Sequence, residues 1–207
     1  MRVREIMSSP AVVVPPELPV KEAAAVLNAH GFTCLPVVAD DGSLVGIVSE
    51  GELVADRFPP DPRLPIAERV DRNPGRVVAD VMVRDVLSAN PQEAAADLLT
   101  VLRSADIRSL PVVEDGVVVG VVTYRDLVRA FARDDRLIEA DVRRRLNLCG
   151  GVGRWQATVQ DGEVTIVDDR HDLPERSAAI RVAEAVIGVS RCRVVEAPVP
   201  GGARMAQ

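Results

Sequence analysis

The sequence has very few aromatic residues: three Phe, one Tyr and one Trp among 207 residues. It is nevertheless 47% hydrophobic, which is enough for a substantial core. That core must be built from Val, Ala, Leu and Ile, because burial of their aliphatic surface is the main driving force left to the chain. The length allows one domain or two.

Cysteine and histidine are also scarce, with three and two copies. Cys34, Cys149 and Cys192 lie far apart, and no CxxC or Cys/His spacing of a metal site is present. We expect reduced, mostly buried thiols in a cytoplasmic protein. His30 is expected at a helix end, where the helix dipole favours a positive imidazole, and His171 in a polar turn. Neither histidine is expected to be catalytic.

The chain has no excess of positive charge. Lys21 is its only lysine and the net charge is −6, which argues against a nucleic-acid surface. No stretch approaches the length and apolarity of a membrane span, and no signal-peptide pattern is seen. Walker-type, GxGxxG, GxSxG and HExxH motifs are not found either. The sequence therefore predicts a cytoplasmic protein that is not an enzyme and does not bind nucleic acid.

The sequence does contain a long internal repeat. Residues 35–54 return as residues 110–128, and each copy reads as strand, turn, strand and helix, with Asp-Gly at the hairpin turn. Residues 3–7 align with residues 78–82, at a shift of 75 positions. The shift falls to 74 after Asp115, because the second hairpin is one residue shorter. A repeat of this length fixes the architecture before any function is considered.

Each copy also carries a helix with an apolar stripe at i, i+3, i+4 and i+7. The stripes consist of Val20, Ala23, Ala24 and Leu27, and of Ala95, Leu98, Leu99 and Leu102.

Local signals place the ends of these helices. The first is expected to open at Pro19 and to end at His30-Gly31, with Gly31 as the left-handed cap. The second is expected to start at Asn90 with a capping box to Glu93, and to run to about Ala105. Shorter helices are expected at residues 50–57 and 125–133, and a short strand at residues 12–14.

The doubled pattern of a Met-containing lead-in, a helix, Leu-Pro-Val-Val and a glycine strand resembles a tandem pair of CBS domains. The resemblance covers about residues 1–57 and 76–133. It implies a compact pseudo-symmetric pair that commonly forms homodimers and often binds adenine nucleotides in the cleft between the repeats. Residues 58–75 then form a connector, for which a lid, a dimer contact and a tether are considered and the tether is favoured. A helical turn is expected at residues 64–70.

From Asp134 the pattern changes to helix, strand, strand, helix and strand. The first expected helix spans 134–147 and is nearly continuous with the helix before it. Strands are expected at 156–159 and 164–167, joined by a turn at Asp161-Gly162. A second helix should open at Asp172 and Pro174, with the apolar stripe Ala179, Ala183, Val186 and Ile187, and a last strand is expected at 192–195. Trp155 is expected to pack against the first of these helices, rather than to anchor an interface.

This order, with Asp-Gly-Glu-Val-Thr-Ile at 161–166 and a late Gly188, resembles a BON domain over about residues 134–197. The resemblance implies a phospholipid-binding or interaction module. Asp168 and Asp169 stand where the family usually has a second glycine, so the turn is altered near the expected surface. The fold class is therefore α+β, two CBS repeats and a small αββαβ BON-like domain, with a disordered tail at 198–207.

Ligand-binding residues are expected at the end of the glycine strand in the second copy. Asp126 follows Thr123 by three residues, so the hydroxyl and the carboxylate meet at one sheet edge. A carboxylate accepts two hydrogen bonds from a ribose diol, and the hydroxyl donates to ribose or phosphate. Gly120 lets the base lie close to the backbone, and Arg108 is placed to meet phosphate. The alternative makes Thr123 and Asp126 a helix cap, and both interpretations are compatible.

The first copy departs from this pattern. Ser49 keeps the hydroxyl, but Glu52 replaces the shorter aspartate and Thr33 stands at the position of Arg108. We therefore expect the second site to bind an adenine nucleotide (AMP, ADP or ATP) and the first to be weak or empty.

The sequence as a whole predicts a regulatory homodimer in which nucleotide binding is passed to the BON-like module, and from it to a protein partner or weakly to phospholipid. The helix at 134–147 is the expected mechanical link. The alternatives are a ligand-free structural homodimer and a phospholipid-associated protein. Weak lipid binding is expected because Arg143, Arg144 and Arg145 are offset by nearby acids.

Overall fold

The computed structural model describes residues 1–58, 63, 74–170 and 172–197. Most of the connector, His171 and the C-terminal tail lie outside these residues, as does the helical turn expected at 64–70. The described chain divides into two compact units. One is Met7–Asp126, here called the repeat unit. The other, here called the C-terminal unit, joins Met1–Ile6 to the chain from Leu127 onward.

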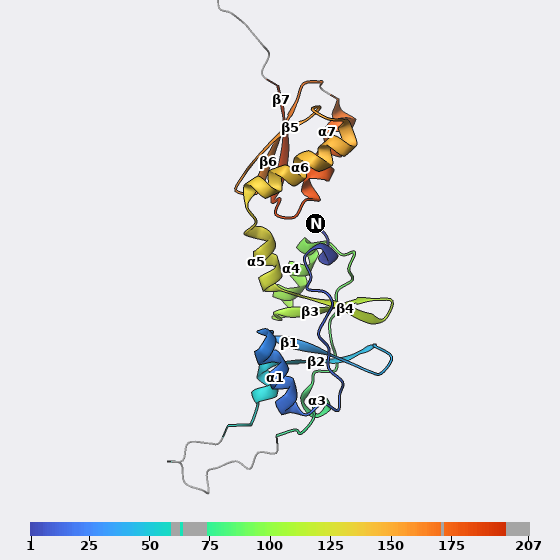
Figure 1. Ribbon diagram of the computed structural model, residues 1–207, viewed down its shortest axis with the longest axis vertical. Helices are drawn as coiled ribbons and strands as arrows, with labels where there is room; N and C mark the ends of the chain where they lie inside the picture. Colours follow the sequence, from blue (N-terminus) through green and yellow to red (C-terminus); the bar gives the residue numbers. More distant parts are fainter. Residues whose placement is uncertain (59–62, 64–73, 171, 198–207) are drawn as a thin grey trace, which may run out of the picture. The chain divides into compact units, whose positions relative to one another are not determined.

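The repeat unit shows each copy as helix, strand, strand and helix, as the sequence predicts. Its elements are α1 (Val20–His30), β1 (Cys34–Val38), β2 (Leu44–Ser49), α2 (Glu50–Val54), α3 (Val78–Val81), α4 (Ala95–Ser104), β3 (Ser109–Glu114), β4 (Val117–Thr123) and the start of α5 (Tyr124–Phe131) (Figure 1). Gly31 caps α1 in the left-handed region at φ 64°, as expected. Asp115 and Gly116 both have positive φ, the backbone that a two-residue hairpin turn requires.

Several local predictions in the repeats are wrong. The helix expected from Asn90 begins five residues later, because the Asn90 side chain accepts a hydrogen bond from the Gln92 backbone N–H at 2.8 Å and closes a turn ahead of the helix. The strand expected at residues 12–14 is reduced to one bridge residue, Val14, paired with Val37. The helices α2 and α5 also end before Arg57 and Arg133, the predicted last residues.

The apolar stripes pack as expected in three of their four positions. Leu99, the exception in α4, is 39% exposed, and Ala24 in α1 is only partly buried. The buried members are Val20, Ala23, Leu27, Ala95, Leu98 and Leu102.

The two hairpins meet through equivalent residues. Ser109 donates its hydroxyl to Cys34 Sγ at 2.9 Å, and these two residues are 75 positions apart. Ser43 and Val117, equivalent at the later shift of 74, form an antiparallel bridge. Contacts between the same position of two copies are what a twofold axis produces. The repeats are therefore related by a pseudo-twofold axis that passes between their hairpins.

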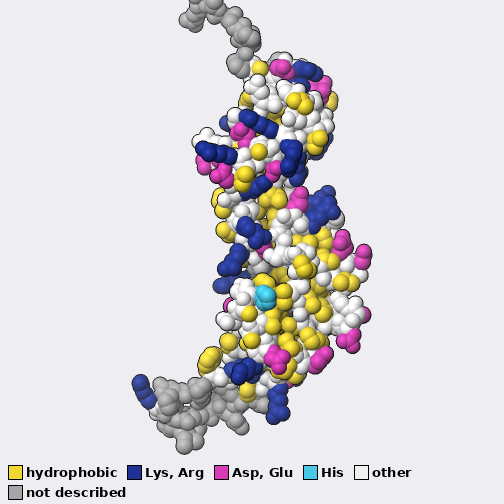
Figure 2. All heavy atoms as spheres, in the orientation of Figure 1, with side chains coloured by type: hydrophobic (Ala, Val, Ile, Leu, Met, Phe, Trp, Pro, Cys, Tyr) yellow, Lys and Arg dark blue, Asp and Glu magenta, His cyan; other side chains and the backbone are white. Residues whose placement is uncertain are grey.

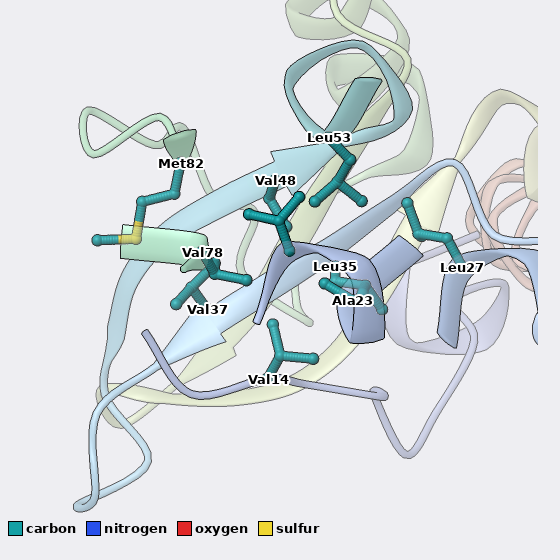
Figure 3. Packing of buried hydrophobic residues seen from close by; sticks show 10 residues of the cluster. Val14, Ala23, Leu27, Leu35, Val37, Val48, Leu53, Val78 and Met82 are labelled. Atoms are coloured by element: carbon teal, nitrogen blue, oxygen red, sulfur yellow. The ribbon is translucent and has the colours of Figure 1, made fainter. Parts of the chain in front are cut away.

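Each repeat begins with a lead-in segment, residues 3–8 in the first and 78–83 in the second. Each lead-in segment crosses the glycine-containing strand of the other repeat, β4 or β2. Val83 exchanges two backbone hydrogen bonds of 2.9 Å with Ile47 of β2. Ser8 exchanges two, of 2.9 and 3.0 Å, with Val121 of β4. The second lead-in also completes the core of the first repeat, since Val78 and Met82 are buried against residues of the β1–β2 hairpin (Figure 3). The core of the first repeat thus includes residues that lie after that repeat in the sequence.

The C-terminal unit contains the predicted αββαβ order. Its elements are η1 (Val3–Glu5), the end of α5, α6 (Asp135–Gly150), β5 (Gln156–Gln160), β6 (Glu163–Asp168), α7 (Leu173–Glu184) and β7 (Arg191–Glu196) (Figure 1). The sheet order is β5-β6-β7, with β5 antiparallel and β7 parallel to β6. Asp172 caps α7 by accepting from the Glu175 N–H at 3.0 Å, as expected. No helix in the described part of the chain is long and apolar enough to cross a membrane.

Two further expectations concern α6. It is separated from α5 by residues 132–134, and Asp134 caps it, so the two helices are not continuous. Trp155 is 7% exposed and belongs to the same buried cluster as Ile138, Val142 and Leu146 of α6, so its predicted packing is confirmed.

Side chains of α6 cover the outer edge of β5. Asp135 accepts from the N–H groups of Asp161 and Gly162 at 2.6 and 2.9 Å. Glu139 accepts from the Val159 N–H at 3.2 Å, and Arg143 Nε donates to the Ala157 carbonyl at 3.0 Å. Spaced four residues apart, Asp135, Glu139 and Arg143 share one helix face. Glu139 and Arg143 satisfy backbone groups that the edge strand β5 would otherwise expose, and Asp135 satisfies those of the turn that follows it.

Asp168 is a buried charge, whereas the sequence placed it in an altered turn near the surface. Its side chain is 0% exposed and accepts from Arg154 at 2.7 Å and from Arg176 at 2.5 Å. Burial alone raises the pKa of this carboxyl, but the hydrogen bonds from Arg176, the Arg170 N–H and Arg154 outweigh it and hold the pKa well below its usual range. The surface expectation was wrong because the arginines that neutralise Asp168 come from other parts of the chain.

Candidate functional site

The Thr123–Asp126 pair forms at the junction of β4 and α5. The Thr123 backbone N–H and hydroxyl both donate to Asp126 Oδ2 at 2.8 Å. The Asp126 N–H donates back to Thr123 Oγ1 at 3.4 Å. The Asp126 side chain is buried, in a residue that is 3% exposed. The helix-cap interpretation is therefore realised, and any ligand must share a carboxylate that already serves the fold.

Ser8 is a member of this site that the sequence analysis missed. Its hydroxyl donates to Asp126 Oδ1 at 3.4 Å, a long hydrogen bond, and the residue itself is exposed. The contact joins residues 118 positions apart. No local pattern marks Ser8, because it reaches the site only through the crossing of the lead-in over β4.

Gly120 is required by that crossing. A Cβ at this position would lie 2.8 Å from Met7 Sδ and 2.9 Å from the Ser8 carbonyl oxygen, too close for any real side chain. Gly46 has the equivalent neighbours in the first copy, where a Cβ would lie 2.6 Å from Met82 Sδ. The close backbone approach expected at Gly120 exists, but the group that makes it is the lead-in. A contact of Gly120 with a ligand stays a prediction.

Arg108 lies beside the site through its backbone. Its carbonyl accepts from the Tyr124 N–H at 3.3 Å, directly after Thr123. The Arg108 side chain is exposed, and its guanidinium forms no ion pair with any residue that the structure describes. Thr33 makes the equivalent backbone bond to the Glu50 N–H at 3.3 Å and supplies no charge.

The first copy builds the same cap with different groups. The Ser49 N–H donates to Glu52 Oε2 at 2.9 Å, and the Ser49 hydroxyl donates to the same oxygen. Burial alone raises the pKa of Glu52, but these two hydrogen bonds outweigh it and lower the pKa below its ordinary value. Val83, at the position equivalent to Ser8, is 44% exposed and offers no donor from its side chain.

The six predicted site residues thus fall into two groups. Thr123, Asp126, Gly120 and Arg108 gather around the end of β4 with Met7 and Ser8. Ser49 and Glu52 gather at the end of β2. Ser49 and Thr123 are the cross-strand partners of Cys34 and Ser109, which touch each other at the pseudo-twofold axis. The two groups are therefore related by that axis, and neither shares a residue with the other.

The remaining titratable candidates are structural. His30 ends α1 and stacks on Phe32, with ring centroids 5.0 Å apart. Of the three thiols only Cys34 is buried; Cys192 is half-buried and Cys149 is exposed, so the expectation of mostly buried thiols holds for one of them. Burial raises the pKa of Cys34 against a smaller opposing effect of the Ser109 hydroxyl, and burial with Glu184 raises that of Cys192 to about 11. Both thiols are thus poor nucleophiles near neutral pH.

Comparison with known proteins matches the CBS domain model to residues 3–56 and 78–133. The A-adding tRNA nucleotidyltransferase of Aquifex aeolicus is 31% identical over 134 residues, which are 65% of this chain and 15% of that enzyme. The L-aspartate semialdehyde sulfurtransferase of Methanocaldococcus jannaschii is 29% identical over 130 residues, 62% of this chain and 23% of that enzyme. The chain therefore matches only a small part of either enzyme. The CBS domain-containing protein YhcV of Bacillus subtilis is 27% identical over 125 residues, 60% of this chain and 81% of its own length.

Solved structures give the same result. The CBS domain pair of protein MJ0100 in complex with 5′-methylthioadenosine and S-adenosyl-L-methionine has 27% identity and a TM-score of 0.53, covering 63% of this chain and 95% of its own. CBSX2 in complex with AMP has 27% identity and a TM-score of 0.50, covering 62% of this chain and 94% of its own. Because the family model matches both repeats and more than half of the chain, this protein belongs to the CBS domain family and contains a tandem CBS pair.

Proposed function

We propose that the protein is a regulatory sensor that binds an adenine nucleotide at the end of β4 and does not catalyse a reaction. The observation that carries the proposal is the buried Asp126 carboxylate, held by Thr123 at a strand end of a CBS pair. Two similar structures were solved with ligands: CBSX2 with AMP, and the CBS domain pair of protein MJ0100 with 5′-methylthioadenosine and S-adenosyl-L-methionine. Adenosine is the part that these ligands have in common.

The chemistry of the site fits such a ligand. A ribose diol donates two hydrogen bonds, and a carboxylate is an acceptor that strengthens both by its charge. The exposed guanidinium of Arg108 suits a phosphate. In this proposal Asp126 binds the ribose, Thr123 shares the contact, and AMP, ADP or ATP is preferred over an uncharged nucleoside.

A thermal-shift panel tests the proposal. The full chain is melted with AMP, ADP, ATP, NAD and S-adenosylmethionine, each at about a hundred times its expected dissociation constant. A bound ligand then stabilises the folded state by about 2.7 kcal/mol, which is a clear shift in melting temperature. If no nucleotide shifts the melting temperature of the protein, the sensor proposal fails and the ligand-free structural dimer becomes the better account.

Assembly is a second part of the proposal. We expect a cytoplasmic homodimer formed through helices of the repeat pair. Apolar residues exposed on α4, among them Leu99 and Val101, at 39% and 37%, favour such a contact. Light scattering that finds a monomer at about 10 μM, where an obligate interface should hold, would contradict the dimer.

The C-terminal unit completes the proposal as an interaction module of BON type that passes the signal to a protein partner. Direct binding to anionic lipid is expected to be weak, because Arg143, Arg144 and Arg145 pair with Glu139, Asp141 and Glu5. Figure 2 shows basic and acidic side chains side by side on the visible face of this unit. Tight, salt-sensitive sedimentation with anionic vesicles would favour the phospholipid alternative.

A further inference from the structure

The C-terminal unit contains a cleft that the nucleotide proposal does not use. Its walls come from α6, from the loop that follows α6, from β5 and from Val167 of β6. Its volume is about 380 Å³, within the range of about 300–1,000 Å³ that small-molecule sites occupy. If each heavy atom takes about the 30 Å³ of a water molecule, the cleft has room for a ligand of about a dozen heavy atoms.

The cleft lies where the edge of the sheet meets α6. Gln156 is paired with Val167, so their side chains, and that of Thr158, lie on one face of the sheet. Ala157 lies between Gln156 and Thr158 and is buried on the opposite face, in the cluster that contains residues of α6 and α7. The cleft is therefore bounded by α6 on one side and by the outer face of the sheet on the other.

Trp155 forms the buried wall of the cleft. One face of its ring is covered by Arg154, whose guanidinium carbon lies 3.9 Å from the ring centroid. Arg154 is itself held by ion pairs to Asp168 and Glu175 at 2.7 and 3.0 Å. The Trp155 indole N–H donates to no described residue, and no fully buried side-chain nitrogen of the described chain lacks a partner, so this N–H is accessible. Trp155 thus offers a rigid aromatic surface and an unpaired donor.

Arg143 is the one charged residue among those that line the cleft in the described chain. Its Nε donates to the Ala157 carbonyl at 3.0 Å and its Nη2 lies 2.9 Å from Glu139 Oε1, so the guanidinium is held at the edge of β5. Glu139 does not line the cleft, and its other oxygen accepts from the Val159 N–H at 3.2 Å. Nη1 of Arg143 donates to no described residue. The cleft therefore presents a positioned cation with free donors and no acid beside it.

These features define the chemistry of a ligand. A single guanidinium suits one negative group, and a carboxylate matches its planar arrangement of donors. Trp155 and Val167 suit an apolar body, and the other polar side chains of the lining are neutral. We propose that the cleft binds a small organic carboxylate, with its charge at Arg143 and its apolar body against Trp155 and Val167. The proposal is independent of the nucleotide site, with which the cleft shares no residue.

Fluorescence of the full chain tests the site directly, because Trp155 is the only tryptophan. Phenylacetate is the probe, and phenylacetamide is its uncharged match. Phenylacetate should give a saturable change with a dissociation constant of about 1 mM, as expected for a ligand of this size. Phenylacetamide should bind about tenfold more weakly, because it forms no charge-assisted hydrogen bond with Arg143.

Arg143→Gln is the variant and Arg144→Gln is the matched control. Arg144 is the neighbouring arginine, with a side chain that is 71% exposed and paired with Asp141, and it does not line the cleft. Arg143→Gln should weaken phenylacetate binding about tenfold and leave phenylacetamide binding unchanged. Arg144→Gln should change neither.

A second variant covers the case in which Arg143→Gln fails to fold, because Arg143 also bonds the Ala157 carbonyl. Thr158→Glu adds a negative charge to the exposed wall of the cleft and leaves the contacts of Arg143 in place. It should weaken phenylacetate binding by about threefold or more, through repulsion between like charges, and spare phenylacetamide. Circular dichroism reports the folding of each variant.

The outcomes are distinct from those of the nucleotide experiments. Loss of affinity for the acid alone, in Arg143→Gln or, if that variant is unfolded, in Thr158→Glu, supports the site. The proposal is overturned by no saturable change up to about ten times the expected dissociation constant, by equal binding of acid and amide, or by equal losses in Arg143→Gln and Arg144→Gln. Equal binding of inorganic phosphate also overturns it, since the cleft would then hold an adventitious ion only. None of these results changes the expected binding of AMP.

Discussion

The Ser49–Glu52 and Thr123–Asp126 pairs are built alike. In each, a strand-end residue donates its N–H and its hydroxyl to one oxygen of an acid three residues later. The N–H distances are 2.9 and 2.8 Å. Each pair follows a glycine strand that a methionine of the opposite lead-in crosses. The motif itself is therefore a structural cap in both copies.

The copies differ in what surrounds the cap. The second has Ser8 over the acid and Arg108 at its flank; the first has Val83 and Thr33. These four residues lie outside the strand-to-helix motif. The strand-to-helix motif therefore determines where the acid lies in both copies. We propose that ligand preference depends on the residues that other segments bring to the acid. The predictions below test this separation of structural and functional parts.

The largest effect is expected where the copies are equivalent. Gly46→Ala and Gly120→Ala each place a Cβ against a lead-in methionine and carbonyl, and each should lower the free energy of unfolding by about 2 kcal/mol. Chemical denaturation measures both. Gly51→Ala is the control, because a Cβ there meets only Ser49 Oγ, at 3.8 Å, within a helix that alanine favours. A large loss in one copy only would show that the crossings are not equivalent.

The next effect should separate the copies. Asp126→Ala removes the acceptor for the ribose, and a hydrogen bond to a charged group is worth about 1.5–3 kcal/mol, so AMP affinity should fall by at least about tenfold. Glu52→Ala should change the affinity less than about twofold. Calorimetry on both variants, with circular dichroism to confirm folding, gives the comparison. Equal losses of AMP affinity in the two variants would contradict the predicted difference between the two sites.

A smaller effect is expected from Arg108 and Thr33, the residues that lie beside the two caps. Arg108→Ala removes an exposed charge that faces solvent, so AMP binding should weaken by only about threefold. Adenosine, which lacks the phosphate, should bind the variant and the wild type equally. Thr33→Ala is the matched change in the first copy and should alter neither ligand. Weaker adenosine binding by Arg108→Ala would mean that the arginine acts through the fold.

The smallest effect concerns the pH dependence of the first cap. Because the pKa of Glu52 is lower in the folded state than its ordinary value of 4.5, its charge contributes stability that is present above about pH 4.5 and is lost as the pH falls through the folded pKa. We expect a contribution of about 0.5 kcal/mol at neutral pH, after screening by solvent. Denaturation curves of the wild type and Glu52→Gln from about pH 7 to about pH 3 should converge in acid. A constant difference would contradict the assignment.

Much of the fold follows from local pattern and from the repeat. The Asp-Gly turns, the Gly31 cap and the αββαβ order of the C-terminal part all depend on residues close in sequence, and the structure has them where the sequence predicts them. The start of α4 does not follow, because Asn90 can cap a helix or close a turn, and the local sequence fits both.

Long-range contacts set the limit of prediction at the site. The positions of Thr123 and Asp126 follow from the repeat, but Ser8 joins them only through the lead-in crossing, which no local signal shows. Asp168 is the same case, because its neutralising partners lie on either side of it in sequence, Arg154 just before β5 and Arg176 on α7, and meet only when the C-terminal unit folds. An internal repeat predicts the elements that the two copies have in common. It does not predict that the lead-in segment of one copy packs on the strands of the other.

The number of nucleotides bound per chain tests the asymmetry most directly. Equilibrium dialysis against labelled AMP, carried to about ten times the dissociation constant, measures this number for the wild type and for the Asp126→Ala and Glu52→Ala variants. The account predicts one nucleotide per chain, bound at the end of β4 and lost in Asp126→Ala but not in Glu52→Ala. Two equal sites per chain, or one site that Glu52→Ala abolishes, would contradict it.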